Sequence, residues 1–498
     1  MRADGPASAT ATEPAPERVD VFILGAGFAG LGLGIRLARE GAHTFVIAER
    51  SDSVGGTWRD NTYPGVACDI PSHLYSFSFR QKPDWSSVFA PGPEIRAYLE
   101  ECAREEGLLP HLRLGSELLR AEWDETDSRW SITTTIGRYS ARALVTAAGR
   151  LSEPRIPATP GLDTFDGPHF HTSRWNHDVD LRGRRVGITG TGASAVQVLP
   201  ALAAEASEVV VFQRSAPYVV PRGDRRYSDA EKTRLASDPQ LLDDSRNTIF
   251  WKAEQTFPSR LGRQPDLSAQ RDLWQNHLDD QVDDPALREA LTPDYEIGCK
   301  RVLLSDDYYP ALALPTVHLE KSALVSLDGS RATAASGRTH DLDVLIFATG
   351  FHSTRQPYAE RIAGRRGELL SEHWADGMTA YASTVVHGFP NLFIIDGPNA
   401  SLGHNSAIHM IETQLEYVLG ALAHLAGHPD AALDVSAEAE ASYTADIDAA
   451  AAPTVWLTGG CRSWYVDDRS HRLTLLWPGY AHTFRERNGR FEARPFGV

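Results

Sequence analysis

Three glycines near the amino terminus have the spacing of a phosphate-binding turn. Gly25, Gly27 and Gly30 form the pattern G-x-G-x-x-G directly after an apolar run, residues 19–24. The first glycine permits a tight turn, the second lets a pyrophosphate approach bare backbone, and the third lets the following helix pack closely on the strand. The N–H groups at the start of that helix bind the phosphates. The pattern therefore predicts a site for an adenine dinucleotide.

A carboxylate downstream supports the same site. Glu49 ends a second apolar run and lies about 20 positions after Gly30, where an acidic residue accepts hydrogen bonds from ribose hydroxyls. The alternative, an incidental glycine turn, does not account for this carboxylate. The first site should therefore hold FAD or NAD.

A second turn of the same kind follows in the middle of the chain. Gly190, Gly192 and Ala195 form the alanine-ended version of the pattern after another apolar run. The residue at the position equivalent to Glu49 is Arg214. A guanidinium can bind a 2′-phosphate bidentately, whereas a carboxylate would repel it. The second site should therefore hold NADPH, and the alternative is that Arg214 is an ordinary surface arginine.

Two dinucleotide sites require elements that place them together. Two further apolar runs, residues 143–149 and 343–350, end in small-residue turns that commonly return the chain between nucleotide-binding domains. We therefore expect an α/β fold with two Rossmann-like dinucleotide-binding domains, in which an inserted NADP domain splits the FAD domain. The charged, turn-poor stretch at residues 223–294 predicts a helical subdomain within the insert. The expected boundaries are 19–150 and 345–498 for the FAD domain and 151–344 for the NADP domain.

The overall composition excludes several classes of partner. The chain has 498 residues and a net charge of −17, so we expect neither nucleic acid nor an anionic membrane as a partner. Residues 1–18 are rich in Ala, Pro, Thr and Glu, which predicts a disordered tail rather than an export signal. No apolar run approaches the ~20 residues that span a bilayer. We expect a cytoplasmic protein that is a monomer or a weak homodimer.

The cysteines bear on the type of flavin chemistry. Cys68, Cys102, Cys299 and Cys461 are far apart and fit neither CxxC nor zinc-binding spacing. We therefore expect reduced, mostly buried thiols and no metal site. Flavin-dependent disulfide reductases need a redox-active cysteine pair, so this class is close to excluded. For a flavin that NADPH reduces, the remaining reactions are oxygenation of a heteroatom and oxygenation of a ketone.

A glycine- and aromatic-rich stretch follows the first nucleotide site. Residues 55–69, GGTWRDNTYPGVACD, contain Thr57, Trp58 and Asp69. The stretch has a G-x-W, an aromatic residue followed by proline, and a final aspartate at fixed spacing. In all these positions it resembles a fingerprint of type I Baeyer–Villiger monooxygenases.

A second stretch, FDGPHFHTSRWN, links the two predicted domains. Phe165, Gly167, His171 and Trp175 match the family's other fingerprint, FxGxxxHxxxW, while Asn176 replaces the usual Pro or Asp. Related flavin monooxygenases that oxidise nitrogen and sulfur carry Tyr or Phe at the position of Trp175, so this residue favours ketone oxidation. The resemblance places His171 and Trp175 at the NADP site, where His171 couples domain movement to the position of NADP. The alternatives for this histidine are a structural role and, less favoured, half of a metal-binding HxH pair.

The resemblance also implies a reaction and its catalytic residues. A C4a-peroxide forms on the reduced flavin, stays deprotonated, and attacks a ketone to give an ester or lactone. Arg301, in the segment YEIGCKRVLLSDDYYP, resembles the family's arginine over the flavin, and Asp69 resembles the carboxylate that positions it. Arginine keeps its proton and can stabilise an anion in a dry pocket. Lys300 would join Arg214 on the 2′-phosphate. The alternatives are an ordinary ion-pair role for Arg301 and a turn cap for Asp69.

Three further positions lie outside the fingerprints. Gly397 and Pro398 form a turn after an apolar run, and in the family such a segment lies near the flavin ring. Trp464 matches a tryptophan of a mobile substrate-side loop that can contact NADP, and its alternative is a simple core position. Arg150, directly after the first AAG turn, departs from the family pattern.

The sequence thus predicts an enzyme that uses FAD, NADPH, O2 and a small-molecule ketone. One alternative is an N- or S-oxygenating monooxygenase that uses the same peroxide in protonated form. The other is a catalytically idle protein that binds flavin or NADP.

Overall fold

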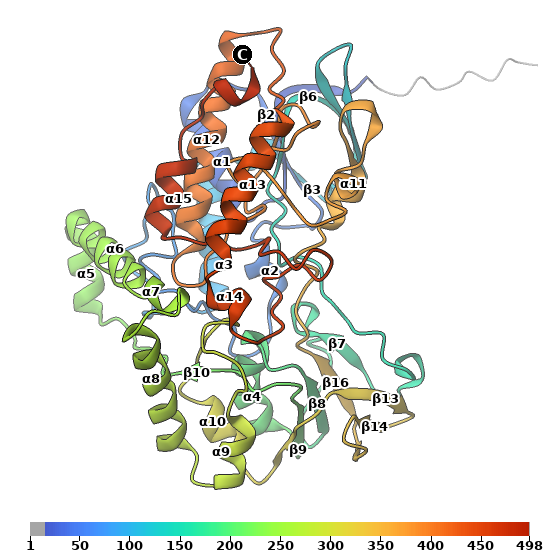
Figure 1. Cartoon of the computed structure of the whole chain (residues 1–498), viewed down its shortest axis with the longest axis vertical. Helices are drawn as coiled ribbons and strands as arrows, with labels where there is room; N and C mark the ends of the chain where they lie inside the picture. Colours follow the sequence, from blue (N-terminus) through green and yellow to red (C-terminus); the bar gives the residue numbers. More distant parts are fainter. Residues whose placement is uncertain (1–14, 498) are drawn as a thin grey trace, which may run out of the picture.

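The computed structural model describes residues 15–497 and has an α/β fold built on two main β sheets (Figure 1). One sheet with its helices forms the upper part of the view, and the other forms the lower part. Each of the two sheets carries one of the glycine turns at the end of a central parallel strand. This arrangement confirms the predicted fold class.

The first sheet has eight strands and carries the first glycine turn. Strand β1 pairs in parallel with β2 on one side and with β6 on the other, and Val21 to Ile23 of β1 are fully buried. Strands buried on both faces form continuous apolar runs. Across the sheet the strands are β17 (Ile362–Ala363), β4 (Leu118–Asp124), β5 (Arg129–Thr134), β6 (Arg138–Thr146), β1 (Glu17–Leu24), β2 (Phe45–Glu49) and β3 (Leu112–Leu114), and β18 (Leu392–Ile394) also pairs with β6.

Helices from both ends of the chain cover this sheet. Helix α1 (Phe28–Glu40) starts directly after the glycine turn and packs on α12 (Ala407–Gly427), a long apolar helix near the carboxyl terminus. Figure 1 shows these two helices side by side. The other helices of this half are α2 (Thr57–Asp60), α3 (Gly92–Glu105), α11 (Leu370–His373), α13 (Ala437–Ala451), α14 (Val455–Thr458) and α15 (Ala481–Asn488).

The second sheet is entirely parallel and carries the second glycine turn. Helix α4 (Ala193–Glu205) follows that turn, and α10 (Tyr308–Leu312) packs against α4. Across the sheet the strands are β12 (Val317–Glu320), β9 (Glu208–Phe212), β8 (Arg185–Thr189), β16 (Val344–Phe347) and β7 (His169–His171). Two small sheets accompany it, namely β10 (Val219–Val220) with β11 (Leu303–Leu304), and β13 (Leu324–Asp328), β14 (Arg331–Ala334) and β15 (Thr339–Asp341).

The stretch between β10 and β11 is helical. In Figure 1, α5 and α6 project from one side of the molecule, and α8 lies beside the second sheet's half. Buried side chains of this stretch include Leu242, Trp274 and Leu278. Its helices are α5 (Asp229–Ser237), α6 (Pro239–Glu254), α7 (Phe257–Arg260), α8 (Asp266–Gln281) and α9 (Pro285–Leu291).

Two expected boundaries differ from the elements. Strand β1 begins at Glu17, so the last two residues of the expected tail belong to the sheet, and residues 1–14 lie outside the described part. The expected boundary at residue 345 falls inside β16, which pairs with β8 and β7. An apolar run such as VLIF indicates a buried strand but carries no sign of which sheet it joins.

The expectation of four reduced cysteines is wrong. Cys299 and Cys461 form a disulfide with a Cα–Cα distance of 6.1 Å, although 162 positions separate them in the sequence. Cys68 and Cys102 are free and buried, as expected. Sequence spacing could not reveal the pair, because the fold alone brings the loop after α14 against the segment before β11.

Residues 15–497 lack both a membrane-spanning helix and a metal-binding cluster. No helix among them is both long enough and apolar enough to cross a membrane. They also contain no group of three or more His, Cys, Asp or Glu residues that could hold a metal ion.

Candidate active site

The first glycine turn has a geometry that only glycine tolerates. Gly25 has a φ angle of +106°, and a Cβ atom there would lie 2.5 Å from the carbonyl oxygen of Ala147. A Cβ atom at Gly30 would lie 1.9 Å from the carbonyl oxygen of Gly25. Gly27 forms the N-cap of α1 without a side-chain hydrogen bond. The start of α1 is therefore held against the strand ends, and its N–H groups remain available to phosphate.

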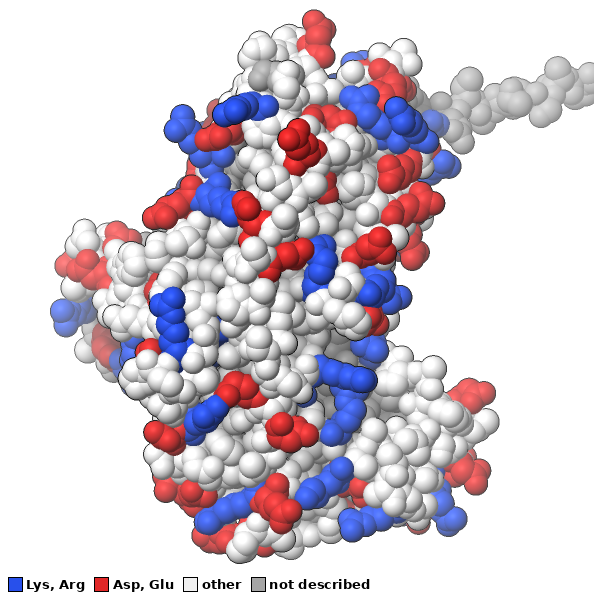
Figure 2. All heavy atoms as spheres, in the orientation of Figure 1, with Lys and Arg blue, Asp and Glu red and all other residues white. Residues whose placement is uncertain are grey.

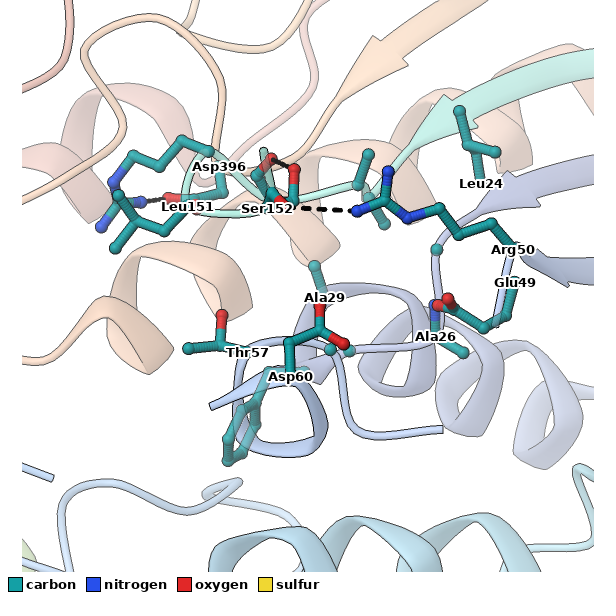
Figure 3. Close-up of a pocket in the computed structure, with 18 of the residues that line it drawn as sticks. Leu24, Ala26, Ala29, Glu49, Arg50, Thr57, Asp60, Leu151, Ser152 and Asp396 are labelled. Carbon is teal, nitrogen blue, oxygen red and sulfur yellow. Dashed lines mark hydrogen bonds and ion pairs between the residues drawn. The ribbon is translucent and has the colours of Figure 1, made fainter. Parts of the chain in front are cut away.

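A cavity of about 380 Å³ opens at this turn (Figure 3). Its walls include the glycine turn, the end of β2, helix α2, the AAG turn after β6, the turn after β18 and the start of α12. Residues that line it include Gly25, Ala26, Gly27, Glu49, Arg50, Thr57, Trp58, Asp60, Gly149, Arg150 and Asp396.

The polar groups of this cavity fit FAD. Glu49 is buried, and its carboxylate accepts hydrogen bonds from the N–H groups of Ala26 and Ser51, both at 3.0 Å. The Nη1 atom of Arg59 lies 3.0 Å from Oε1 of the same carboxylate. These contacts fix the acid where a ribose would bind. The Nε atom of Arg150 is buried without a hydrogen-bond partner, as expected where a bound group supplies the acceptor.

Thr57 and Trp58 begin helix α2 and line the same cavity. Trp58 is buried, and its Nε1 atom donates to the hydroxyl oxygen of Tyr75 at 3.3 Å. Sequence reasoning missed Arg50, which also lines the cavity and forms an ion pair with Glu153. Its position directly after Glu49 was the one available signal.

The second glycine turn repeats the geometry of the first. Gly190 has a φ angle of +107°, and a Cβ atom there would lie 2.3 Å from the carbonyl oxygen of Ala348. Gly192 is the N-cap of α4, and a Cβ atom there would meet no atom within 4 Å. Ala195 is buried in the first turn of the helix. The start of α4 thus faces open space, as a bound pyrophosphate requires.

Two basic side chains converge beyond the second turn. Arg214 follows β9 and is exposed, and the Nζ atom of Lys300 donates to Oγ of Ser215 at 2.6 Å. The same ammonium lies 4.4 Å from the ring centroid of Tyr295. Burial lowers the pKa of Lys300, and the nearby charge of Arg214 lowers it further. Two cations this close repel each other, so an anion between them would relieve the repulsion.

Part of the visible surface is locally basic although the protein is acidic overall. Figure 2 shows acidic and basic side chains interspersed over the visible face. Basic side chains gather around the hollow between the upper and lower parts, at the right of the view. The net charge of −17 therefore does not prevent an anionic nucleotide from approaching there.

Arg301 and Asp69 form an ion pair between the two halves of the molecule. The Nε and Nη2 atoms of Arg301 lie 2.7 and 2.6 Å from Oδ2 of Asp69. The charge of Asp69 raises the pKa of Arg301, and Tyr465 adds to this effect. The guanidinium therefore stays protonated. Neither member of the pair lines the 380 Å³ cavity, but Arg301 is close enough to act on Arg150, which does.

Known proteins resemble this chain over nearly its whole length. A family model described as pyridine nucleotide-disulphide oxidoreductase matches residues 22–230. A Baeyer–Villiger monooxygenase of Streptomyces coelicolor is 44% identical over 490 residues, which cover 98% of this chain and 94% of that protein. The chain belongs to the Baeyer–Villiger monooxygenase family. A second member, from Pseudomonas aeruginosa, is 39% identical over 98% of this chain and 93% of its own length.

Solved members of the Baeyer–Villiger family share the fold. Cyclohexanone monooxygenase from Rhodococcus sp. Phi1, bound to NADP+, aligns with a TM-score of 0.85 at 30% identity and covers 95% of this chain and 97% of its own. Steroid monooxygenase bound to NADP aligns with a TM-score of 0.82 at 32% identity, over 94% of this chain and 96% of its own. The predicted family is thereby confirmed.

The second Baeyer–Villiger fingerprint lies where the chain passes between the halves. His171 ends β7, which pairs with β16, and its ring lies 5.5 Å from that of Phe351 just beyond β16. Its Nδ1 atom accepts the N–H of Ser173 at 3.1 Å. Burial lowers the pKa of His171 to about 4, so the imidazole is neutral at pH 7. Trp175 packs on Phe170 with a centroid distance of 5.2 Å.

Three residues expected at the cofactors lie near the cavity or on a neighbouring loop. Gly397 and Pro398 follow β18, but in the described chain the cavity is lined by the preceding Asp396 and not by these two. Trp464 is 39% exposed, and its ring lies 4.5 Å from that of Tyr465. The loop that carries both aromatic residues includes Cys461, so the disulfide joins it to the segment of Lys300 and Arg301.

Proposed function

We propose that this protein is an NADPH- and O2-dependent flavoprotein monooxygenase that inserts one oxygen atom next to a ketone carbonyl, giving an ester or a lactone. Its membership of the Baeyer–Villiger family supports this activity. The observation that carries the proposal is the Arg301–Asp69 ion pair, which joins the two halves that hold the nucleotide turns.

The FAD site is formed by the first sheet's half, residues 19–150 and the segment after β16. Gly25, Gly27 and Gly30 present the start of α1 to the pyrophosphate, and Glu49 binds the ribose. Thr57 and Trp58 line the wall of the cavity. FAD and NADP are present together in a solved relative of 26% identity. When bound, the flavin accepts hydride from NADPH and activates O2.

The NADPH site is formed by the second sheet's half, from about residue 151 through β16. The turn at Gly190 and Gly192 receives the pyrophosphate, with Ala195 packing behind it. Arg214 and Lys300 bind the 2′-phosphate as two converging cations. His171 and Trp175 support this site at the crossing between the halves, and Trp464 contributes from its loop.

Arg301 acts where negative charge develops on oxygen during attack on the ketone. A fixed cation in a water-poor site stabilises such charge more strongly than it would in water. Asp69 keeps the guanidinium in place through two contacts to one oxygen atom. Asp69 is therefore a positioning residue, and Arg301 is the catalytic one.

The experiment that tests this function is a substrate panel combined with one variant. Purified enzyme with NADPH and O2 is offered ketones, amines and sulfides, and mass spectrometry locates the added oxygen. We expect oxygen next to the carbonyl of at least one ketone. Arg301→Ala should keep the rate of flavin reduction by NADPH and lose ester formation roughly a hundredfold or more, as when a fixed charge-stabilising donor is removed.

Two results would overturn the assignment. Oxygen transfer to amines or sulfides alone would favour the N- or S-oxygenating alternative. Unchanged ester formation by Arg301→Ala would remove this residue from the chemistry. Arg365→Ala is the matched control, because Arg365 also binds an aspartate through Nε (Asp434, 2.7 Å) but does not line the FAD cavity.

A further inference from the structure

Arg150 lines the FAD cavity, and the reaction described above does not use it. Arg150 follows the AAG turn after β6, and Asp396 follows β18. Because β6 and β18 are parallel neighbours, with Thr146 opposite Ile394, their carboxyl ends bring Arg150 and Asp396 together. The two side chains form an ion pair and are largely buried, at 12% and 14% exposure.

This pair lies at the end of the cavity that is remote from the ribose position. Figure 3 shows Asp396 and Leu151 on the left of the cavity, and Glu49 with Arg50 on the right. Glu49 stands where the dinucleotide fingerprint places the adenosine ribose. An extended FAD whose adenosine ribose binds at Glu49 would therefore place its flavin ring toward Arg150 and Asp396.

The carboxylate of this pair is rigidly placed. Asp396 has a φ angle of +60°, and its N–H group donates to Oε1 of Gln414 at 2.9 Å. The buried amide of Gln414 in turn donates to the carbonyl oxygens of Ser383 (2.7 Å) and Ile394 (3.0 Å). Helix α12 thus holds the turn after β18, and the turn holds the carboxylate.

The arginine keeps an unused donor and a full charge. Its Nε atom is buried and has no hydrogen-bond partner in the structure. Burial lowers the pKa of Arg150 to about 10, which leaves it protonated at pH 7. A buried N–H group without an acceptor is costly, so its presence in a ligand cavity indicates an acceptor on the ligand.

We propose that Arg150 contacts the bound flavin, that its free Nε–H donates to an electronegative atom of the flavin ring, and that Asp396 is its positioning residue. A fixed cation beside the ring favours the reduced form, which carries more negative charge than the oxidised form. Arg150 therefore raises the reduction potential of the bound flavin. The inference requires a bound flavin but not the ester-forming reaction.

The test measures the midpoint potential of the purified FAD-loaded enzyme without NADP. Arg150→Met keeps an unbranched apolar stem and removes the charge and the donor. We expect the preference for reduced over oxidised flavin to fall at least tenfold, which corresponds to about 30 mV for a two-electron couple. The dissociation constant of FAD should rise several-fold in the same variant.

A second variant, Asp396→Asn, should shift the midpoint potential in the opposite direction. It removes the neutralising carboxylate and leaves the arginine charge uncompensated, so the midpoint potential should rise. Arg246→Met is the matched control, because Arg246 is a similarly buried arginine (11% exposed) near the carboxylate of Glu412 and does not line the cavity. The midpoint potential of the flavin in Arg246→Met should equal that in the unaltered enzyme.

The signs of the shifts decide the outcome. A fall for Arg150→Met and a rise for Asp396→Asn, with no change for the control, support the proposal. An unchanged potential in either of the two cavity variants, or a shift of the same sign in both, overturns it. If Arg150→Met does not fold, the direction of the potential shift in Asp396→Asn decides the outcome: a rise supports the proposal, and a fall or no change overturns it. These readouts do not depend on which substrate the enzyme oxidises.

Discussion

At the residue scale, the two glycine turns differ in the charge of the side chains beyond them. The two glycine turns have nearly identical backbone geometry, with φ angles of +106° at Gly25 and +107° at Gly190. The side chains beyond them differ, since Glu49 is a buried carboxylate and Arg214 an exposed cation beside Lys300. In the proposed function, the backbone provides a common phosphate site, and these side chains discriminate between FAD and NADPH.

Removing the guanidinium of Arg214 tests this discrimination. Arg214→Ala should raise the KM for NADPH roughly tenfold to a hundredfold, because a charge-assisted contact to phosphate is lost. The KM for NADH, which has no 2′-phosphate, should hardly change. Steady-state NADPH and NADH oxidation measures both values. Arg182→Ala, an exposed arginine of the same half paired with Asp180, is the control. Equal increases for both nucleotides would contradict the assignment.

At the element scale, two glycines of the second turn, Gly190 and Gly192, differ in how much space surrounds them. A side chain at Gly190 would collide with the strand end, whereas Gly192 faces open space. These glycines thus have separate roles. Gly190 is needed for the fold of the turn, and in the proposed function Gly192 is needed for a pyrophosphate to approach the start of α4.

Alanine substitutions should separate these roles. Gly192→Ala should change the free energy of unfolding by no more than about 0.5 kcal/mol, because the added Cβ atom meets no other atom. The same variant should raise the KM for NADPH at least several-fold. Gly190→Ala should lower stability as well, since a positive φ angle disfavours alanine. Thermal denaturation and NADPH titration distinguish the two effects. Normal NADPH binding by Gly192→Ala would argue against phosphate binding at α4.

At the scale of the whole molecule, the two halves are joined by covalent and ionic links. The disulfide between Cys299 and Cys461 connects the segment before β11 to the loop after α14. Another connection is made by Glu254 of α6, whose carboxylate accepts hydrogen bonds from the N–H groups of Ala481 and His482. Both links join the inserted part of the chain to its carboxyl-terminal part.

Reduction of the disulfide should weaken the folded state. A cross-link between residues far apart in sequence restricts the unfolded chain, so reduction should lower the free energy of unfolding by roughly 2–4 kcal/mol. Urea unfolding with and without a thiol reductant measures the change. The double variant Cys299→Ser/Cys461→Ser should not respond to the reductant, since Cys68 and Cys102 are free thiols. An equal response of the variant would show that the effect has another origin.

Acid should destabilise the molecule through its buried histidines. Burial lowers the pKa of His73, His171 and His409 from 6.5 to about 4. Between pH 6.5 and pH 4 the unfolded chain binds more protons than the folded chain. The contribution of these histidines to the free energy of unfolding is therefore fully present above pH 6.5 and is lost as the pH falls toward 4. Urea unfolding at several pH values gives the slope. His409→Gln keeps an N–H donor for the carbonyl oxygen of Ala481 and should lower the slope of stability against pH. An unchanged slope would show that His409 does not contribute to the pH dependence.

The sequence alone determined the family, the α/β class and both nucleotide turns. Such features depend on the spacing of nearby residues, because a glycine turn and the strand before it are local structures. The resemblance to the family also identified Arg301 and Asp69 as candidates, although these residues are 232 positions apart.

Only the tertiary structure decided which distant side chains meet. The Cys299–Cys461 disulfide and the ion pair of Arg150 with Asp396, 246 positions apart, have no local signal. The same holds for the membership of β16 in the second sheet. The physical reason is that sequence periodicity records which face of an element is buried, whereas contacts between elements depend on how the sheets and helices pack.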